Sequence, residues 1–404
     1  MLQSIRTARD EYPRQFWLLF WGMLISATGA SMIWPFLMVY VSGRLHLPLA
    51  ASASIMTANS MMSIIFTFIA GPMADKIGRK WVMVISLLGN GLVYLLYQNA
   101  TTYLQFCVIA GMAGSFNPLF RVGADAMLAD LIPEGKRIDA YSLIRLSNNL
   151  GVALGPTIGG FLAATSYSIA FFFAAIGMST YGIMMLLLGK ETIPTRNIGM
   201  VEEERARPRL GGYNLIFTDR PFMQFVAAFT LIQVCAALVW ILLSVYTKEQ
   251  FGIPENLYGF LPATNGMMIV ILQLAVTAWT RKRMPHSMLA LGSAFYGIAT
   301  FSIAFMTGFW GFWFSMILMT IGEMILVPTS STFAANLAPV DMRGRYMSLY
   351  SLTWGLATGI GPVLGGMLSD NLGPRFIWFG GGLIGLASVL VFLTLKNRTK
   401  TAAG

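Results

Sequence analysis

A single acidic residue, Glu323, lies inside a long apolar stretch, and it is the first residue in this chain whose placement suggests chemistry. At 1.5 Å per helical residue counted from Trp310, its carboxyl lies about 20 Å along a helix of that stretch. No basic residue lies within one helical turn of it. Burial in lipid disfavours the charged form, so this carboxyl should be neutral much of the time and should ionise when water or a cation arrives. That behaviour suits a proton-exchange site, and the alternative is a permanently protonated structural carboxyl.

A second group of ionisable residues lies on the apolar stretches near 103–130 and 138–164. Arg121 and Asp125 are four residues apart, which places them on one face of a helix and within reach of each other. Arg145 should lie at a similar depth on the following helix. Two readings stay open for this group. Asp125 either alternates between a proton and an arginine partner, or it forms a fixed structural salt bridge.

The composition indicates whether these ionisable residues lie in water or in a membrane. The chain has 404 residues, of which 56% are hydrophobic and only 11% charged, with a mean hydropathy of +0.66. Soluble domains carry roughly 25% charged residues, so this is a polytopic membrane protein. Cys107 and Cys235 lie in apolar runs and are expected to be inert packing residues. His46 and His286 fall in separate loops, and no phosphate-binding loop is present, so we expect no metal, no cofactor and no enzymatic activity.

A membrane-spanning helix needs about 20 mainly apolar residues. Twelve such stretches predict an all-α membrane protein with twelve transmembrane helices in two pseudo-symmetric six-helix bundles. They run near 16–41, 49–73, 81–99, 103–130, 138–164, 168–189, 221–247, 256–280, 286–307, 309–333, 345–367 and 374–395.

The basic residues predict the orientation of these helices. Nearly all of the 27 Lys and Arg residues lie at the termini or in the connections that follow even-numbered spans. By the positive-inside rule, both termini of this multi-pass protein lie in the cytoplasm. The net charge of +10 is therefore explained by topology in a cell membrane, with the lipid bilayer as partner and no nucleic acid. The exceptions are Arg44, Lys248 and Arg375 on the opposite side, and Arg121 and Arg145 within spans.

One long polar segment divides the spans into six and six. We interpret residues 190–220 as a cytoplasmic linker, partly helical on the membrane surface, between bundles at 1–189 and 221–404. A shift of 206 residues places Pro133 on Pro339 and Arg137 on Arg343. The same shift superposes the four residues Gly155, Pro156, Gly159 and Gly160 on Gly361, Pro362, Gly365 and Gly366. The halves are duplicated bundles, an arrangement known from secondary transporters.

Two motifs make a resemblance specific. The loop after the second span reads Gly71-Pro-Met-Ala-Asp75-Lys-Ile-Gly78-Arg79-Lys80, and span five reads Gly151-Val-Ala-Leu-Gly155-Pro156-Thr-Ile-Gly159-Gly160. The first resembles the signature loop of the major facilitator superfamily. The second resembles a motif of that family's proton-coupled drug exporters. The resemblance covers essentially the whole chain.

The resemblance implies roles for the loop residues. Gly71 and Gly78 would allow a tight turn and a close helix approach. Asp75 would lie against the N-terminus of span eleven, and Arg79 would pair with Asp130 at the end of span four. These contacts would close the cytoplasmic side and break when it opens. The alternative is a charged turn that serves topology only.

The repeated glycine and proline residues suggest a seam. Small residues let helices pack backbone to backbone, and Pro156 and Pro362 would kink their helices, so the seam could stay tight while the halves rock. If the family fold holds, polar and aromatic residues on the inner spans line the substrate cavity, although each could simply bridge two helices. The candidates are Trp34, Asn117, Gln233, Trp240, Asn265 and Gln273.

These observations predict a secondary active transporter, a proton-coupled exporter of lipophilic or cationic compounds that works by alternating access. Its partners would be protons and a small-molecule substrate, and we expect it to act as a monomer. The alternative within the same fold is an uptake symporter or a facilitator for a small metabolite. A non-transporting membrane sensor or a lipid-modifying enzyme is the alternative from a different class.

Overall fold

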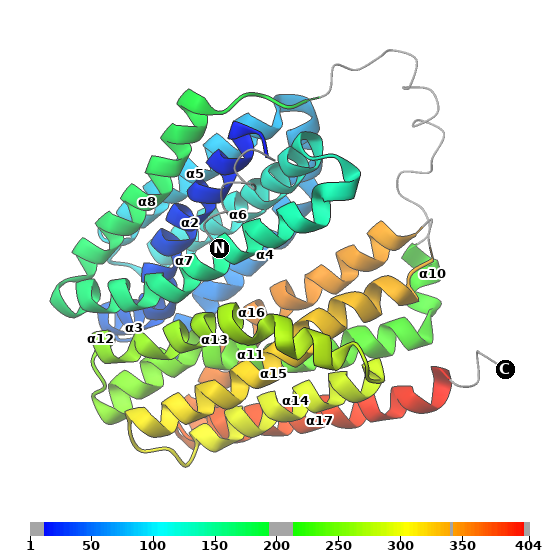
Figure 1. The fold of residues 1–404 in the computed structure, drawn as a ribbon. Helices are drawn as coiled ribbons and strands as arrows, with labels where there is room; N and C mark the ends of the chain where they lie inside the picture. Colours follow the sequence, from blue (N-terminus) through cyan, green and yellow to red (C-terminus); the bar gives the residue numbers. More distant parts are fainter. Residues whose placement is uncertain (1–11, 194–212, 340–341, 400–404) are drawn as a thin grey trace. The chain divides into compact units, whose positions relative to one another are not determined.

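The computed structural model describes residues 12–193, 213–339 and 342–399, and these residues are almost entirely helical (Figure 1). The elements of the first part of the chain are α2 (Arg14–Ile33), η1 (Trp34–Phe36), α3 (Leu37–Leu45), α4 (Leu49–Ile77), α5 (Arg79–Tyr97), α6 (Tyr103–Leu131), η2 (Glu134–Lys136), α7 (Arg137–Thr165) and α8 (Tyr167–Leu188). Those of the second part are α10 (Tyr213–Thr218), α11 (Arg220–Phe251), α12 (Glu255–Tyr258), α13 (Phe260–Thr280), α14 (Pro285–Ile303), α15 (Phe309–Leu337), α16 (Arg343–Leu372) and α17 (Phe376–Thr399).

Each of the twelve predicted spans corresponds to one helix or to one helix with a short interruption. Within the described residues, eight segments are both long enough and apolar enough to cross a membrane. The other four, α6, α7, α14 and α16, have comparable lengths but lie outside that apolar set. They include the two helices with the repeated glycine and proline motif and the helix with Arg121 and Asp125. The polar residues in these four helices therefore make them less apolar than the other eight spans.

Local chemistry sets several helix ends. Thr102 and Gln105 form a capping box at the start of α6, in which each side chain accepts a hydrogen bond from the other residue's backbone N–H. At the end of α14 the structure differs from the sequence prediction by a few residues, because the chain after Ile303 tightens into turns with bonds to the third preceding carbonyl, as from Met306 N to Ile303 O.

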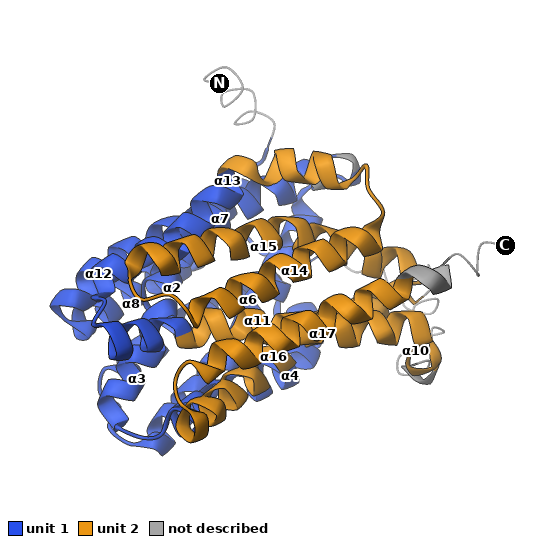
Figure 2. Ribbon diagram, turned by 90° about the horizontal axis from the view of Figure 1, so that it is seen from below, with its two compact units in different colours: residues 1–193, 243–270 blue, residues 194–242, 271–404 orange. Residues whose placement is uncertain are grey.

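The chain divides into two compact units, coloured separately in Figure 2. Unit 1 comprises residues 1–193 and 243–270, and unit 2 comprises residues 194–242 and 271–404. The predicted boundaries at 189 and 221 follow the order of the spans, whereas this division follows contacts and assigns 243–270 to unit 1. The division of the twelve spans into two bundles of six therefore stays a prediction.

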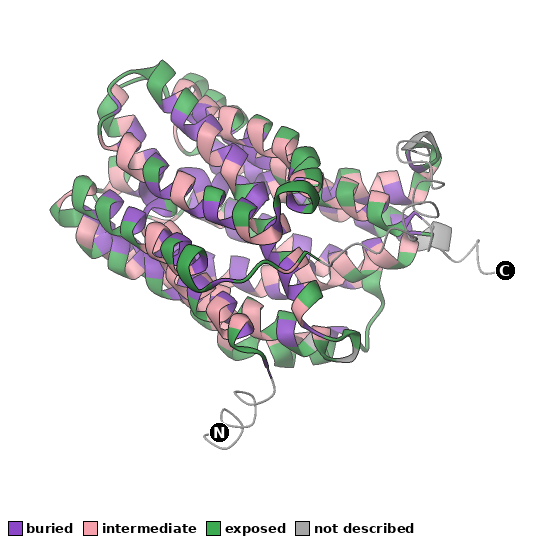
Figure 3. Ribbon diagram, turned by 90° about the horizontal axis from the view of Figure 1, so that it is seen from above, coloured by how far each residue is buried: buried purple, intermediate pink, exposed green. Residues whose placement is uncertain are grey.

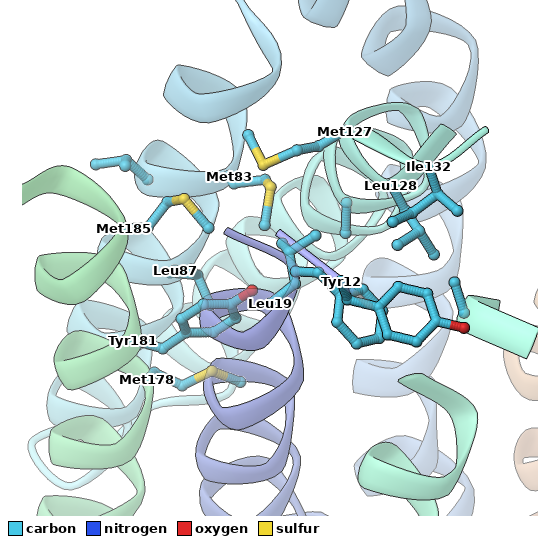
Figure 4. Packing of buried hydrophobic residues seen from close by; sticks show 14 residues of the cluster. Tyr12, Leu19, Met83, Leu87, Met127, Leu128, Ile132, Met178, Tyr181 and Met185 are labelled. Atoms are coloured by element: carbon cyan, nitrogen blue, oxygen red, sulfur yellow. The ribbon is translucent and has the colours of Figure 1, made fainter. Parts of the chain in front are cut away.

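Unit 1 has an apolar cluster between α2, α5, α6 and α8. In Figure 4 the side chains of Leu87 and Met178 lie beside the Tyr181 ring, and those of Met83 and Met185 lie above it. Most members of the cluster are buried, and in Figure 3 the helices alternate between buried and exposed residues along their length. Methionine adapts its shape to irregular gaps, so the cluster fills this end of the unit and supports the polar loop residues that follow Ile77 and Leu131.

Unit 2 is held by aromatic residues on α11. Phe225 and Phe229 stack with ring centroids 5.8 Å apart, and Tyr350 of α16 lies 5.0 Å from Phe229. The hydroxyl of Tyr346 donates a hydrogen bond to Asp219 Oδ2 over 2.8 Å. Asp219 Oδ1 accepts from the backbone N–H of Phe222 at 3.1 Å, so this carboxylate also caps the start of α11.

The predicted linker is described only at its ends. Residues 190–193 follow α8, and α10 (Tyr213–Thr218) is a short helix within the predicted linker. The acidic and basic residues between them lie outside the described residues.

Candidate functional site

The loop between α4 and α5 holds an arginine between two carboxylates. Arg79 Nη2 lies 3.2 Å from Asp75 Oδ1, and Arg79 Nε lies 3.1 Å from Asp130 Oδ2. The structure thus joins Arg79 to the acid that the sequence indicated, at the end of α6. The contact with Asp130 is an ion pair rather than an aligned hydrogen bond, because Nε has no hydrogen-bond partner of good geometry among the described residues. The Arg79 side chain is only 12% exposed, so its charge depends on these partners.

A third carboxylate, Glu191, completes this cluster and was missed in the sequence. Glu191 Oε1 accepts from the backbone N–H of Arg79 at 3.0 Å, and Oε2 accepts from that of Lys80 at 3.2 Å. The first N–H groups of a helix lack partners within the helix and carry partial positive charge, so a carboxylate placed there is favourable. Glu191, which lies just after the end of α8, therefore caps α5.

Gly78 makes room for this cap. Its φ of +122° is a conformation that side chains rarely adopt, and a Cβ there would collide with the Glu191 carboxylate. The second glycine of the loop motif is thus required twice, for its backbone conformation and for its lack of a side chain.

The residues around Glu191 are tied to the same cluster. Thr192 Oγ1 donates to Asp130 Oδ2 over 3.1 Å. Gln15 on α2 donates to the carbonyl of Lys190 and accepts from the Lys190 N–H, at 2.5 and 3.3 Å. The chain after α8 is therefore fastened to α2, α5 and α6 at once. In the sequence Glu191 is one of several acidic residues in the predicted cytoplasmic segments, and no pattern distinguishes it from the others.

The turn expected at Gly71 is not present. Residues 71–77 continue α4 without a break, and a Cβ at Gly71 would meet no atom within 4 Å. The chain turns only at Gly78, because the helix tolerates Pro72 in its interior. Asp75, in the last helical turns, is 74% exposed and pairs with Arg79 from its own helix. Its predicted contact with span eleven stays a prediction.

The first copy of the glycine motif lies against backbone. A Cβ at Gly155 would lie 2.6 Å from the carbonyl oxygen of Thr28, and one at Gly151 would lie 3.0 Å from that of Leu24. Gly159 faces the backbone of Met32 at still closer range. Helices α2 and α7 therefore approach as closely as helices can, which agrees with the predicted role of small residues in packing.

The second copy lies against side chains instead. A Cβ at Gly361 would meet Val234 Cγ1 at 3.3 Å, and one at Gly365 would meet Leu238 Cδ2 at 2.5 Å. Pro156 and Pro362 are both buried, and α7 and α16 are continuous helices through them. Gly366 is buried like Gly365. The repeat is thus exact in sequence and unequal in packing, since α11 presents branched side chains where α2 presents backbone.

Gly160 packs against α12 instead of α2. Its α-carbon faces the backbone of Glu255 and Asn256 in α12, and a Cβ at Gly259 would collide with the Pro156 carbonyl. Close backbone contact therefore continues from α7 onto α12 and α13, within unit 1. These contacts join residues of the first and second predicted bundles, all of them within unit 1.

An ionic cluster lies at this end of α7. Lys248 Nζ lies 2.9 Å from Glu255 Oε2, and the Tyr167 hydroxyl donates to Glu255 Oε1 over 2.9 Å. Glu255 is only 7% exposed, whereas the Lys248 side chain is 40% exposed. A buried carboxylate with both oxygens satisfied is stable only while its partners stay in place. The sequence did not single out this cluster, because its members lie on three separate helices or helix ends.

Glu323 lies on α15 and is half-buried. It shares a hydrogen bond with the hydroxyl of Tyr296, a residue of α14 that is 3% exposed. The Tyr296 hydroxyl is a neutral group that can bond to either protonation state of a carboxyl, since a hydroxyl both donates and accepts.

Arg121, Asp125 and Arg145 are all exposed. No ion pair within 4.0 Å joins Arg121 to Asp125 in the part of the chain that the structure describes. The described residues therefore show no fixed ion pair between Arg121 and Asp125. Arg145 lines an open hollow of about 490 Å³ on α7, together with Arg137, Tyr141 and Ser142.

The cavity candidates divide by burial. Asn117 and Trp34 are exposed, and Gln233 and Trp240 are half-buried. Asn265 is 2% exposed, which favours a role in helix packing. Gln273 donates to the carbonyl oxygen of Met324 over 3.1 Å and so bridges α13 and α15.

Comparison with known proteins places these features in a family. A sequence profile described as Major Facilitator Superfamily matches residues 19–356 and 296–404. The chain is 26% identical to a Na(+), Li(+), K(+)/H(+) antiporter of Planococcus maritimus, with 89% of each chain covered. It is 23% identical to the quinolone resistance protein NorA of Staphylococcus aureus, covering 96% of this chain and 98% of that one.

A second drug-resistance protein and a solved structure are also similar to this chain. The chain is 27% identical to the class B tetracycline resistance protein of Escherichia coli, with 83% of each chain covered. Among solved structures, a bacterial homologue of the human lysosomal transporter Spinster matches with a TM-score of 0.78 at 10% identity, covering 95% of this chain and 96% of that one. This last likeness concerns the fold alone.

Proposed function

Because the chain belongs to the major facilitator superfamily of transporters, we propose that this membrane transporter exports lipophilic or cationic compounds in exchange for protons. The observation that carries the proposal is the Glu323 carboxyl, which lies midway along α15 and is bonded to a neutral hydroxyl. A carboxyl in that setting changes its charge at low cost when its surroundings change. The relatives named for antiport and for drug resistance support export.

Exchange follows from competition for this carboxyl. When Glu323 is ionised, it attracts a cationic substrate and still accepts the Tyr296 hydrogen bond. When a proton binds, the attraction to the cation is lost, and the substrate is released. Because proton and cation exclude each other, each crossing of the membrane in one direction requires the other species to return.

Alternating access needs a closure at each end of the pathway. We assign the Arg79–Asp130 cluster, with Asp75 directed at span eleven, to the cytoplasmic closure. The Lys248–Glu255–Tyr167 cluster is assigned to the outer closure, because its buried ionic contacts join the two predicted bundles at the other end of α7. The two bundles, at 1–189 and 221–404 with the linker 190–220 between them, would rock about the repeated glycine faces.

The remaining features of the proposal rest on charge and family. The distribution of Lys and Arg supports a cytoplasmic position for both termini. We expect the protein to act as a monomer and to have no enzymatic activity. An uptake symporter or facilitator of a small metabolite is the alternative within the same fold.

A second candidate function is antiport of monovalent metal cations. It is favoured by the 26% identity to the Planococcus maritimus antiporter over 390 residues. In this case Glu323 would bind Na⁺, Li⁺ or K⁺ in competition with a proton.

The test uses the purified protein in liposomes with an imposed pH gradient and a pH-sensitive dye inside. Tetraphenylphosphonium and ethidium should each dissipate the gradient, and Glu323→Gln should abolish this response. Glu134→Gln is the matched control, because its side chain is 92% exposed and lies in the short helix η2 between α6 and α7. A response to NaCl, LiCl or KCl without one to the organic cations would favour the second candidate. An undiminished response in Glu323→Gln would refute the coupling role.

A further inference from the structure

A hollow in unit 1 is lined by basic and hydroxyl-bearing side chains at the start of α7. It has a volume of about 490 Å³, its lining residues are Arg137, Tyr141, Ser142 and Arg145, and we call it the α7 hollow. Two of these residues are cations, and the other two carry hydroxyl groups. One water molecule occupies about 30 Å³ in the liquid, so the α7 hollow has room for a group larger than a bare ion.

Arg145 brings an unpaired charge to the α7 hollow. It is exposed, and it forms no hydrogen bond or ion pair among the described residues. An arginine within a membrane span is costly and normally pairs with another group. Its guanidinium presents N–H donors in a planar fork that matches the oxygens of a phosphate or a carboxylate. The Arg145 guanidinium is therefore available to an oxyanion.

Arg137 provides a second cation that is already held in place. Its Nε donates to the carbonyl oxygen of Ile132 over 3.0 Å, and its Nη2 donates to that of Ala129 over 2.9 Å, both at the end of α6. Its Nη1 forms a loose ion pair with Glu134 at 3.8 Å, and the Glu134 side chain is 92% exposed. The position of the Arg137 guanidinium is thus fixed by α6, while its Nη1 edge stays accessible to a ligand.

The other contacts of α7 hold the hollow in a fixed shape. The two arginines and Tyr141 follow one another at intervals of four residues, so they share one face of the helix. The Tyr141 hydroxyl donates to the carbonyl oxygen of Asp125 on α6 over 3.1 Å. On another face of α7, Ser147 Oγ donates to the carbonyl oxygen of Phe20 on α2 over 2.6 Å. A site whose walls are set before the ligand arrives loses less entropy on binding.

The place of the hollow along α7 matches the headgroup level of a bilayer. The helix has 29 residues, or about 43 Å, and a span centred in a hydrocarbon core about 30 Å thick extends about 7 Å beyond it at each end. Arg145 lies two turns into the helix, about 12 Å from its start and so about 5 Å inside the hydrocarbon edge. Helical side chains lean toward the N-terminus, so a long arginine side chain reaches back from there to the headgroup phosphates.

The second copy of this helix lacks the second cation. The shift of 206 residues carries Arg137 onto Arg343, but it carries Arg145 onto Ser351. Both helices begin alike, so the arginine at the start belongs to the plan that the two halves share. Arg145 occurs in the first copy alone, and a helix of this kind therefore folds without it. This difference favours a role for Arg145 in binding rather than in folding.

We propose that the α7 hollow binds the phosphate group of an anionic phospholipid, with Arg145 as the main contact and Arg137 as the second cation. Basic pockets at the headgroup level of membrane proteins suit anionic headgroups, whose charge they complement. Leu146, 39% exposed and one residue deeper in the span, would lie beside an acyl chain. With the orientation proposed above, the lipid belongs to the cytoplasmic leaflet. The inference does not depend on the transported substrate or on proton exchange.

Thermal unfolding of the purified protein in detergent tests the site. Phosphatidylglycerol should raise the melting temperature at a half-saturating concentration at least tenfold below that of phosphatidylcholine with the same acyl chains, because only the first lipid has a net charge. Arg145→Gln should raise the half-saturating concentration of phosphatidylglycerol about tenfold, as expected for a lost charge-assisted contact. Without lipid, the melting temperature of this variant should stay within about 2 °C of the original protein, because no protein contact is removed among the described residues.

Two further variants provide the controls. Arg145→Lys keeps the charge without the planar fork and should retain part of the response to phosphatidylglycerol. Arg343→Gln removes an exposed cation at the equivalent start of α16, and its half-saturating concentration should stay within twofold of the original value. Equal losses in Arg145→Gln and Arg343→Gln would overturn the site, because general attraction to basic residues would then explain the response. An equal response of the original protein to both lipids would overturn it as well.

Soluble phosphate compounds separate the two sources of such a ligand. Sodium phosphate and glycerol 1-phosphate are added at about 10 mM, against sodium chloride of the same ionic strength as the control for screening. No change beyond that with sodium chloride, together with an Arg145-dependent response to phosphatidylglycerol, supports the lipid headgroup. An Arg145-dependent rise in melting temperature with the soluble compounds and none with phosphatidylglycerol would overturn the lipid assignment and indicate a site for a soluble phosphate compound.

Discussion

The carboxylate of Glu191 occupies the space in which a side chain at Gly78 would lie, and it bonds the first two N–H groups of α5. This relationship links the end of the first six helices to the signature loop, and neither residue indicates the other in the sequence. It also gives the loop glycine a steric role in addition to its conformational one.

Gly78→Ala should therefore be far more disruptive than Gly71→Ala. The added methyl group at position 78 meets the carboxylate and is strained at φ +122°, which should cost about 1–3 kcal/mol and weaken the cap. At position 71 there is open space inside a helix, where alanine is favourable. Thermal unfolding of the two variants in detergent measures the difference. Equal melting temperatures would contradict the steric role, and adding Glu191→Ala to Gly78→Ala should recover part of the loss.

Asp130→Asn should destabilise the protein more than Asp75→Asn. Both changes remove a partner of Arg79, but the Asp130 side chain is 19% exposed and that of Asp75 is 74% exposed. Exposed ion pairs contribute about 0–1 kcal/mol, whereas leaving a mostly buried arginine without the less exposed of its two partners costs more. Chemical denaturation of the two variants side by side is the measurement. If Asp75→Asn were the more damaging variant, the Arg79–Asp130 contact would not be the structural core of the loop.

At the opposite end of α7, Lys248→Met should be more harmful than Glu255→Gln. The first change leaves a 7% exposed carboxylate without its cation, at a cost of about 3–5 kcal/mol. The second leaves a lysine whose side chain is 40% exposed and can reach water. The double exchange, Lys248→Glu with Glu255→Lys, should recover part of the stability. Thermal unfolding gives the order of the three variants, and a reversed order for the single variants would show that Glu255 does not depend on Lys248.

Gly155→Ala and Gly361→Ala should differ although the residues are equivalent in the repeat. A methyl group at 155 would lie 2.6 Å from the Thr28 carbonyl oxygen, which is part of a helix backbone and cannot move alone. At 361 the closest atom is a Val234 methyl group at 3.3 Å, which can shift slightly. We expect a loss of about 2 kcal/mol or more for Gly155→Ala and under 1 kcal/mol for Gly361→Ala, measured by denaturant unfolding. Similar losses would mean that the two seams are equally tight.

Prediction from the sequence was most successful where the signal repeats along the chain. Apolar stretches of membrane length located all twelve spans, and a fixed offset revealed the duplication. The pairing of Arg79 with Asp130 was predicted because Arg79 needs an acid nearby and Asp130 ends the fourth span. Prediction failed for Gly71, because a proline inside a helix has the same local signal as one in a turn. For Arg121 and Asp125 the sequence left two interpretations open, because helical spacing permits an ion pair without requiring it.

By itself, the sequence determined that this protein lies in a membrane, where its helices run along the chain, and that its two halves are duplicated. Hydrophobic burial and backbone hydrogen bonding in a membrane depend on composition and spacing over about twenty residues at a time. Only the tertiary structure decided which polar groups meet. Glu191 reaches α5 across a separation of more than a hundred residues, Glu255 meets Tyr167 from another bundle of the sequence, and Asn90 bonds Asn117 as Tyr296 bonds Glu323. Such contacts depend on a few ångströms of helix placement, and that placement is the sum of many packing contacts rather than a property of any one segment.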